Sequence, residues 1–588
     1  MNIPFVSQPD VILLHAPSVY DFRQEAIVYG PVSDLIPSTP IFEMYPVGFA
    51  SMAAYLRAQG HRVRIVNLAV RMLRNPKFDV DRFVRGLRPK LFGIDLHWLP
   101  HCQGAVEVAR VVKAHHPDIP IVFGGFSSTF FHEELVAYPQ VDFVIRGDSA
   151  EKPLAALLAA VERGGGYEAV PNLTWKEDGE VRVNELSHTP TDIDEFVHGY
   201  EEMTRSVVRY GDLASVLPFY DWMDYPIMPV MATRGCNKNC VFCGGANYAF
   251  KGTMEREHTA FRSPEALLKD IRTIAGLSRG PIFIIGDPYQ PGAWYADRLL
   301  RGFAEHPVPN HIIIEFFSPP PADFSARIAD AIPNHAYEMS MESHDPLVRT
   351  AAGKGYTNEE LEESVPAALR YGAERFDLYY IIGLPKQTAD SVMATIEYCD
   401  HLYSLVKGDP RLTVFISPLA PFLDPGSRGF MEPERFGYRL NRHTLEEHRR
   451  AMLEPSWKYT LNYETEWLDR DALVDVTYRS ALALNEVKRK WGVIPASEAD
   501  VVERRIHKAV EVMKRVDDIL AEETDAEARR RRILALKGEV DEASISTVCD
   551  TRELEWPLVR GLTRFRPGGL VKAALHRTGP RPLEKKGR

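Results

Sequence analysis

Cysteine and long apolar runs are scarce in this chain, and basic residues are fewer than acidic ones. Six cysteines in 588 residues are too few for a disulfide scaffold, and a reducing compartment fits them better. No stretch of about 18 uncharged apolar residues occurs, so we expect no membrane-spanning helix. The first residues lack a basic region followed by an apolar run and a cleavage site, so we expect no signal peptide and a cytoplasmic protein.

Acidic residues outnumber basic ones, 81 to 70, which gives a formal net charge of −11. A chain with this charge is a poor non-specific binder of nucleic acid, so we expect no nucleic-acid partner. The last stretch, 556–588, differs because it holds nine basic side chains and one acidic one. Such a tail fits either weak contact with an anionic membrane surface or acidic partner, or a solvated disordered end.

Short apolar runs alternate with helical stretches through much of the chain, which predicts an α/β fold with parallel sheets. Five runs in the first block predict a Rossmann-like, doubly wound sheet, with a ligand site beyond the carboxyl ends of its strands. These five runs cover 11–16, 62–68, 91–98, 119–125 and 142–148.

Six further runs predict a partial (β/α)6 barrel of the TIM type, whose active face lies at the C-terminal strand ends. These runs begin near residues 227, 281, 311, 336, 376 and 411. Between the two blocks, the turn Asp178-Gly179 predicts a hairpin inside a linker. The predicted parts are a first domain 1–165, a linker 166–226, a barrel 227–430, a mainly helical domain 431–555 and a basic tail 556–588.

Three of the six cysteines, Cys236, Cys240 and Cys243, stand in one short loop after the first barrel strand. Thiolates are the ligands that iron–sulfur clusters use. A closed zinc site needs a fourth protein ligand, but the other cysteines are distant in sequence and His258 stands in a charged stretch. Zinc and chance spacing stay alternatives, while the triplet favours a four-iron cluster with one iron free to bind a substrate or cofactor.

The pattern C-x3-C-x2-C at the first strand end of a six-unit barrel resembles the radical S-adenosylmethionine (radical SAM) enzymes. The resemblance extends to Ile285-Gly286-Asp287-Pro288, Met341-Glu342-Ser343 before Gly353-Lys354-Gly355, and Ile382-Gly383-Leu384-Pro385. It implies a [4Fe-4S] cluster and contacts to S-adenosylmethionine from Phe242, Gly286, Asp287, Glu342, Ser343 and Gly383. Asp287 could instead cap the helix after Pro288, and Glu342 could form an internal salt bridge.

The first block resembles the cobalamin-binding domain that precedes the barrel in one branch of this family, through Tyr45-Pro46-Val47-Gly48, Gly60-His61, Gly124-Gly125 and the segment 146–151. The resemblance implies cobalamin contacts from Pro46, Gly48, Asp95, His97, Gly124, Gly125 and Gly147. The glycines could instead only turn the chain. His97 or His101 is a candidate lower ligand of cobalt, although the histidine motif of other cobalamin proteins follows the first strand and has a glycine that is missing here. A loop histidine more often serves as a hydrogen-bond partner.

The two resemblances together cover about residues 10–430 and imply an enzyme that cleaves S-adenosylmethionine reductively to a 5′-deoxyadenosyl radical. Methylation of an unactivated carbon in a small-molecule or lipid-like substrate is the first hypothesis. A cyclase or rearrangement enzyme and a non-catalytic redox or corrinoid sensor are the alternatives. An external electron donor of the flavodoxin or ferredoxin type is expected, and the sequence identifies no catalytic residue that contacts substrate. Because the two sites lie in separate blocks, replacing the cysteines should leave corrinoid binding largely intact.

Overall fold

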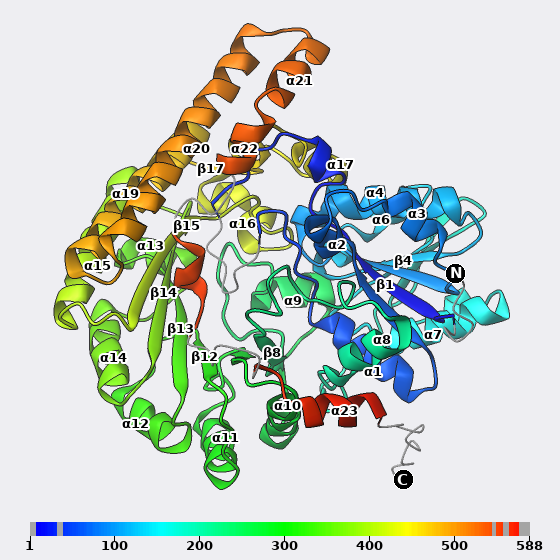
Figure 1. Ribbon diagram of the computed structural model, residues 1–588, viewed down its shortest axis with the longest axis horizontal. Helices are drawn as coiled ribbons and strands as arrows, with labels where there is room; N and C mark the ends of the chain where they lie inside the picture. The colour runs from blue at the N-terminus through cyan, green and yellow to red at the C-terminus, as the bar shows by residue number, and fades with distance from the viewer. Residues whose placement is uncertain (1–7, 32–38, 544–548, 557–563, 576–588) are drawn as a thin grey trace.

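Two α/β blocks lie side by side in the computed structural model, with helices from the C-terminal part of the chain across them (Figure 1). The structure describes residues 8–31, 39–543, 549–556 and 564–575. Parallel strands form the main sheet of each block. The predicted α/β fold class is therefore confirmed.

The N-terminal block contains a seven-stranded sheet in the order β2-β1-β3-β4-β5-β6-β7. The five predicted strands are its parallel part: β1 Val11–His15, β2 Val63–Asn67, β3 Leu91–Asp95, β4 Ile121–Gly124 and β5 Phe143–Ile145. Helices that pack apolar side chains against this sheet include α1 Gly48–Ala58, α4 Cys102–His115 and α7 Glu151–Arg163. The strand order reverses between β1 and β3, which is where ligands bind in doubly wound sheets.

The hairpin that the sequence predicts within a linker is part of the first sheet. Its strands, β6 Leu173–Glu177 and β7 Glu180–Val183, extend the sheet because β6 pairs antiparallel with β5. Leu173 and Trp175 are buried in the core formed with α7, whereas β7 is exposed along its length. The first folded unit therefore continues beyond residue 165, and the linker proper begins after the hairpin.

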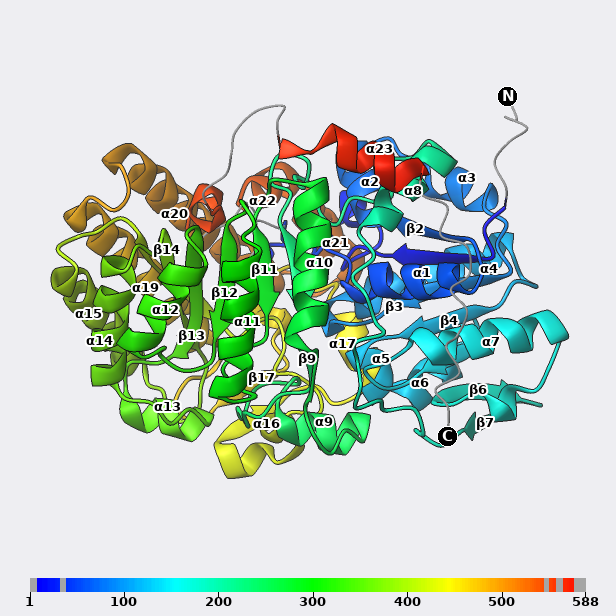
Figure 2. The same cartoon turned by 90° about the horizontal axis from the view of Figure 1, so that it is seen from below.

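The second block is a partial barrel of six parallel strands in the order β15-β14-β13-β12-β11-β8. The strands are β8 Met228–Met231, β11 Ile282–Ile285, β12 Ile312–Phe316, β13 His335–Glu342, β14 Arg375–Ile382 and β15 Leu412–Pro418. The outer helices include α10 Pro264–Leu277, α11 Ala293–Glu305, α12 Ala322–Ala331, α14 Asn358–Arg370 and α15 Ala389–Leu405 (Figure 2). The six strands expected from the apolar runs are all present.

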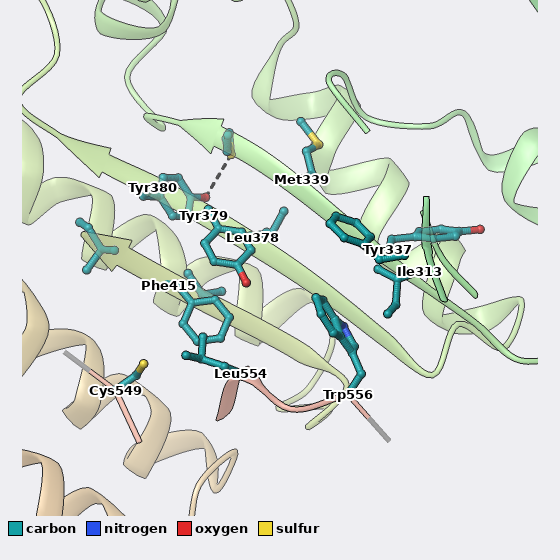
Figure 3. Close-up of a cluster of buried hydrophobic side chains, with 14 of the residues drawn as sticks. Ile313, Tyr337, Met339, Leu378, Tyr379, Tyr380, Phe415, Cys549, Leu554 and Trp556 are labelled. Carbon is teal, nitrogen blue, oxygen red and sulfur yellow. Dashed lines mark hydrogen bonds between the residues drawn. The ribbon is translucent and has the colours of Figure 1, made fainter. Parts of the chain in front are cut away.

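The C-terminal part is mainly helical, as predicted, and its longest helices are α19 Arg470–Trp491 and α20 Ala496–Glu522. The chain then returns to the barrel, where Leu554 and Trp556 pack with Tyr379 and Phe415 in a buried apolar cluster (Figure 3). No helix among the described residues is long and apolar enough to cross a membrane.

Part of the predicted basic tail is folded onto the protein. Helix α23, Pro567–Leu575, contacts α8 Glu201–Tyr210 and α10. Arg205 Nε donates a hydrogen bond to the Ala573 carbonyl oxygen at 2.9 Å. Residues 557–563 and 576–588 of the tail lie outside the described residues, and the predicted contact of the tail with a membrane surface stays a prediction.

Candidate functional site

The three clustered cysteines stand on the loop between β9, Thr233–Arg234, and α9, Asn247–Met254. All three are free thiols. Backbone N–H groups point at two of the sulfurs, from Lys238 to Cys236 Sγ and from Gly245 to Cys243 Sγ, each at 3.3 Å. Such N–H groups stabilise thiolate charge.

Burial raises the pKa of Cys240 to about 11, so its thiol stays protonated until a cation offsets the buried charge. Among the described residues, no three histidine, cysteine, aspartate or glutamate side chains are arranged to hold a single metal ion. Three thiols spread along one loop instead suit a cluster in which each thiolate binds a different iron. The donor set therefore fits a site-differentiated iron–sulfur cluster.

A buried ion pair stands near the cysteine loop at the end of β13. Lys354 Nζ lies 3.2 Å from Glu342 Oε1, and both side chains are almost fully buried. Burial alone would lower the pKa of Lys354, but Glu342 and Cys240 raise it above its ordinary value. The salt bridge considered for Glu342 is thus present, while Glu342 Oε2 has no hydrogen-bond partner within the described part of the chain. That oxygen is free to accept a hydrogen bond from a cofactor ammonium.

Both carboxylate oxygens of Asp287 accept hydrogen bonds from backbone amides. It accepts hydrogen bonds from Tyr289 N at 2.8 Å and Phe317 N at 3.0 Å. Asp287 therefore connects the turn after Pro288 to the end of β12. It does not cap the next helix, α11, because that helix begins at Ala293. The expected contact of Asp287 with S-adenosylmethionine stays a prediction.

Glu315, on β12, is a site residue that the sequence reasoning missed. Gly286 N donates to Glu315 Oε2 at 2.5 Å. Gly286 has a φ of 98°, and a Cβ there would lie 2.5 Å from Thr233 Cγ2, so only glycine fits beside the start of the cysteine loop. The available signal was a single carboxylate inside the apolar strand sequence HIIIEFF.

The protonation of Glu315 gives a testable pH dependence. Burial raises the pKa of this carboxyl to about 7, so between about pH 4.5 and 7 the folded protein binds a proton that the unfolded chain releases. Stability should therefore fall as the pH rises through that interval, by at most about 1.4 kcal/mol per pH unit. In the cofactor-free protein, we expect the melting temperature of Glu315→Gln to fall less steeply with rising pH than that of wild type. Glu305→Gln, at an exposed position, should show the wild-type slope. Equal slopes for Glu315→Gln and wild type would contradict this assignment.

The remaining predicted contacts to S-adenosylmethionine differ in their surroundings. Phe242 stands within the cysteine loop, next to Cys243, and is buried. Ser343 Oγ accepts a hydrogen bond from Asp345 N at 3.2 Å, so it supports the turn before the next helix. At Gly383, a Cβ would lie 2.1 Å from the Tyr463 hydroxyl, which shows that this glycine makes room for a side chain of the C-terminal part. Their cofactor roles stay predictions.

The seven predicted cobalamin residues all line one cavity at the carboxyl edge of the first sheet. Its volume is about 780 Å³, including the part open to solvent, and its walls are mostly apolar. Gly125 has a φ of 117°, and its Cβ would strike the His97 backbone at 2.5 Å. Gly124 is different, because its Cβ would meet only the Ile145 carbonyl oxygen at 3.8 Å. The cavity has the apolar lining of a small-molecule or cofactor site.

Asp95 is held at the cavity by a histidine that the sequence reasoning did not identify. His15 Nδ1 lies 2.9 Å from Asp95 Oδ1, and both side chains are buried. Burial alone would raise the pKa of Asp95, but His15 lowers it below its ordinary value. The carboxylate therefore keeps its charge beside the cavity.

The two candidate cobalt ligands are placed differently. His101 donates from Nε2 to the Phe42 carbonyl oxygen at 2.7 Å and is not among the residues that line the cavity. His97 does line the cavity, and its ring lies 4.6 Å from that of Phe126. Burial lowers the pKa of His97 to about 4, so its imidazole is neutral at pH 7, the form that can bind a metal.

The cavity and the cysteine loop meet at the contact between the two blocks. Arg234, two residues before Cys236, lines the cavity. Phe126 at the cavity contacts Phe250 of α9, with ring centroids 5.5 Å apart. Figure 2 shows α9 beside α5, Phe126–Phe130, at this contact. The two predicted cofactor sites are therefore neighbours.

Each of the two blocks matches a known protein family. Residues 38–158 match the B12 binding domain, and residues 230–399 match the Radical SAM superfamily. The two matched regions contain the cavity and the cysteine loop, respectively.

Curated relatives are similar at low identity. An uncharacterized methyltransferase of Pyrococcus horikoshii is 25% identical over 377 residues, which cover 61% of this chain and 73% of the relative. Hopanoid C-3 methylase of Methylococcus capsulatus is 25% identical over 259 residues, 43% of this chain and 44% of that protein. The anaerobic magnesium-protoporphyrin IX monomethyl ester cyclase of Synechocystis sp. is 26% identical over 209 residues, 35% and 39% of the two chains.

Among solved structures, the radical S-adenosylmethionine methyltransferase TsrM of Kitasatospora setae, with cobalamin and a [4Fe-4S] cluster bound, shares the fold. Its TM-score is 0.55 at 14% identity, and the match covers 91% of this chain and all of TsrM. The cofactors expected from the sequence, a [4Fe-4S] cluster, S-adenosylmethionine and cobalamin, agree with both family domains and with this fold. The chain therefore combines a B12 binding domain with a Radical SAM domain.

Proposed function

We propose that this enzyme methylates an unactivated carbon of a small-molecule or lipid-like substrate. The observation that carries the proposal is the shared boundary of the two sites, where Arg234 lines the cavity two residues before Cys236. One substrate held at that boundary can be reached from both cofactors. The methyltransferase names of two curated relatives support the same reaction class.

When bound, the cluster and S-adenosylmethionine supply a 5′-deoxyadenosyl radical, and cobalamin supplies the methyl group. Cys236, Cys240 and Cys243 would each hold one iron. Glu342 Oε2 would accept a hydrogen bond from the methionine ammonium, while Lys354 keeps Glu342 in place. Phe242 would pack against the adenine.

Other predicted site residues would bind the two cofactors and shield them from water. Gly286, Asp287, Ser343 and Gly383 shape the strand ends that would hold S-adenosylmethionine. The cavity residues Pro46, Gly48, Asp95, His97, Gly124, Gly125 and Gly147 would contact cobalamin. The apolar lining of the cavity excludes water from the cobalamin side, which protects reactive species from side reactions.

Cyclisation is the second candidate, because the relative from Synechocystis is a cyclase. Product analysis with methyl-labelled S-adenosylmethionine separates the two reactions. Label in the product, together with 5′-deoxyadenosine, would support methylation. A label-free product formed with 5′-deoxyadenosine would support cyclisation or rearrangement, and a non-catalytic sensor would form no 5′-deoxyadenosine.

The same proposal implies a class of electron donor and a class of substrate. An external electron donor of the flavodoxin or ferredoxin type would reduce the cluster. A lipid-like substrate is supported by the similarity to hopanoid C-3 methylase. The first measurement is an inventory of iron, sulfide, cobalt and corrinoid per chain in anaerobically purified protein, and an inventory of zinc alone would overturn the proposal.

A further inference from the structure

Two arginines flank the segment that carries the cluster cysteines. Arg234 is the last residue of β9, and Arg256 follows the end of α9 by two residues. Gly235 allows Arg256 to pass close to the start of the loop, because a Cβ at Gly235 would lie 3.0 Å from Arg256 Cδ. One guanidinium group therefore lies at each end of the cysteine segment.

Both guanidinium groups bind carboxylates of the N-terminal block that border the cobalamin cavity. Arg256 pairs with Asp148 and donates hydrogen bonds from its Nε and Nη2 atoms, the second at 2.9 Å. Arg234 Nη2 donates to Glu151 Oε1 at 2.6 Å, and Arg234 Nη1 donates to Ser149 Oγ at 2.7 Å. Asp148, Glu151 and Arg234 all line the cavity next to Gly147.

The two ion pairs form one connected network. Ser149 Oγ donates to Asp148 Oδ1 at 2.8 Å, and Ser51 of α1 donates to Glu151 Oε1 at 2.7 Å. The side chains of Arg256 and Asp148 are only 1% and 3% exposed. Removing one charge from such a pair leaves the other buried and unpaired, so separating the two ends of the pair is costly. We call these two pairs, Arg234–Glu151 and Arg256–Asp148, the interdomain clamp.

We propose that Asp148 and Glu151 are positioning residues through which the interdomain clamp couples the cobalamin cavity to the cluster loop. Ordering of the cysteine loop by the cluster holds Arg234 and Arg256 in place, and these hold the carboxylates that border the cavity. Cobalamin then binds more tightly to cluster-loaded protein, and by linkage the cluster is bound more tightly by cobalamin-loaded protein. This inference rests on the proposed function, and it replaces the sequence-based expectation that the two sites are independent.

The test measures binding of hydroxocobalamin to full-length protein in two forms, one with a reconstituted cluster and one stripped of iron by a chelator. For wild type we expect the loaded form to bind at least fivefold more tightly, the lower range of measured coupling between sites. For the double variant Asp148→Asn with Glu151→Gln, we expect a ratio near one. The single variant Glu151→Gln, which keeps a hydrogen-bonding amide, should give an intermediate ratio and serves if the double variant does not fold.

The matched control is Asp270→Asn, which breaks the buried pair between Arg262 and Asp270. Neither residue of this pair lines the cavity, so the variant should leave the fivefold ratio unchanged. A second readout is the fraction of iron that the protein retains at equilibrium with a chelator, which cobalamin should raise in wild type and in Asp270→Asn but not in the double variant. Equal affinities for loaded and stripped wild type, or an unchanged ratio in the double variant, would overturn the coupling. Failure of wild type to bind hydroxocobalamin in either form would instead remove the proposed cobalamin function itself.

Discussion

Replacing Cys236, Cys240 or Cys243 with alanine is expected to abolish iron–sulfur absorbance and all cleavage of S-adenosylmethionine. Each thiolate would hold a different iron, and the structure offers no nearby cysteine that could substitute, because Cys102, Cys399 and Cys549 are buried elsewhere. A cluster with two protein ligands loses iron. Iron and sulfide analysis, the visible spectrum and 5′-deoxyadenosine formation measure the outcome, and activity should fall below detection.

The controls for this prediction are Cys102→Ala and Cys399→Ala. Both thiols are fully buried in apolar cores, so their removal should cost some stability by leaving small cavities but should leave iron content unchanged. A cysteine-loop variant that kept full iron and 5′-deoxyadenosine formation would remove that cysteine from the ligand set. Loss of iron from either control would mean that the fold, and not the loop, had failed.

The strands were predictable because each is a short apolar run bounded by turn residues, and such runs in βα units leave few alternative arrangements. The hairpin β6–β7 was predicted as a local structure from its turn, but its pairing with β5 was not. Edge pairing depends on which edge of the completed sheet stays open, and a local pattern does not contain that information. For the same reason, the sequence did not predict where the first folded unit ends.

In the candidate site, the sequence reasoning named residues that local motifs mark and missed residues that depend on distant partners. His15 meets Asp95 across 80 positions, and Arg256 meets Asp148 across 108. Lys354 was visible in the motif Gly353-Lys354-Gly355, but its pairing with Glu342 required the bulged end of β13. Long-range ion pairs are chosen by the fold, because burial demands a partner without specifying which one.

Filling the cavity from Gly124 is expected to remove cobalamin binding while leaving the cluster intact. Gly124 lines the cavity, and the nearest atom to a Cβ built there, the Ile145 carbonyl oxygen, is at an ordinary contact distance of 3.8 Å. A Cβ at this position displaces no backbone atom, so we expect the fold of the leucine variant to persist. Gly125 cannot serve for this test, because a side chain at its φ of 117° would strain the chain before it reached the ligand.

For Gly124→Leu we expect cobalamin affinity to fall by roughly 100-fold, about 2.7 kcal/mol of binding free energy, with iron content and melting temperature close to wild type. Cobalamin retained per chain after dialysis measures the effect. Gly165→Leu is the matched control, since Gly165 has no atom within 4 Å of its Cβ position and lies outside the cavity. Unchanged cobalamin stoichiometry in Gly124→Leu would show that the corrinoid binds elsewhere, whereas loss of both cobalamin and melting transition would show only that the leucine does not fit.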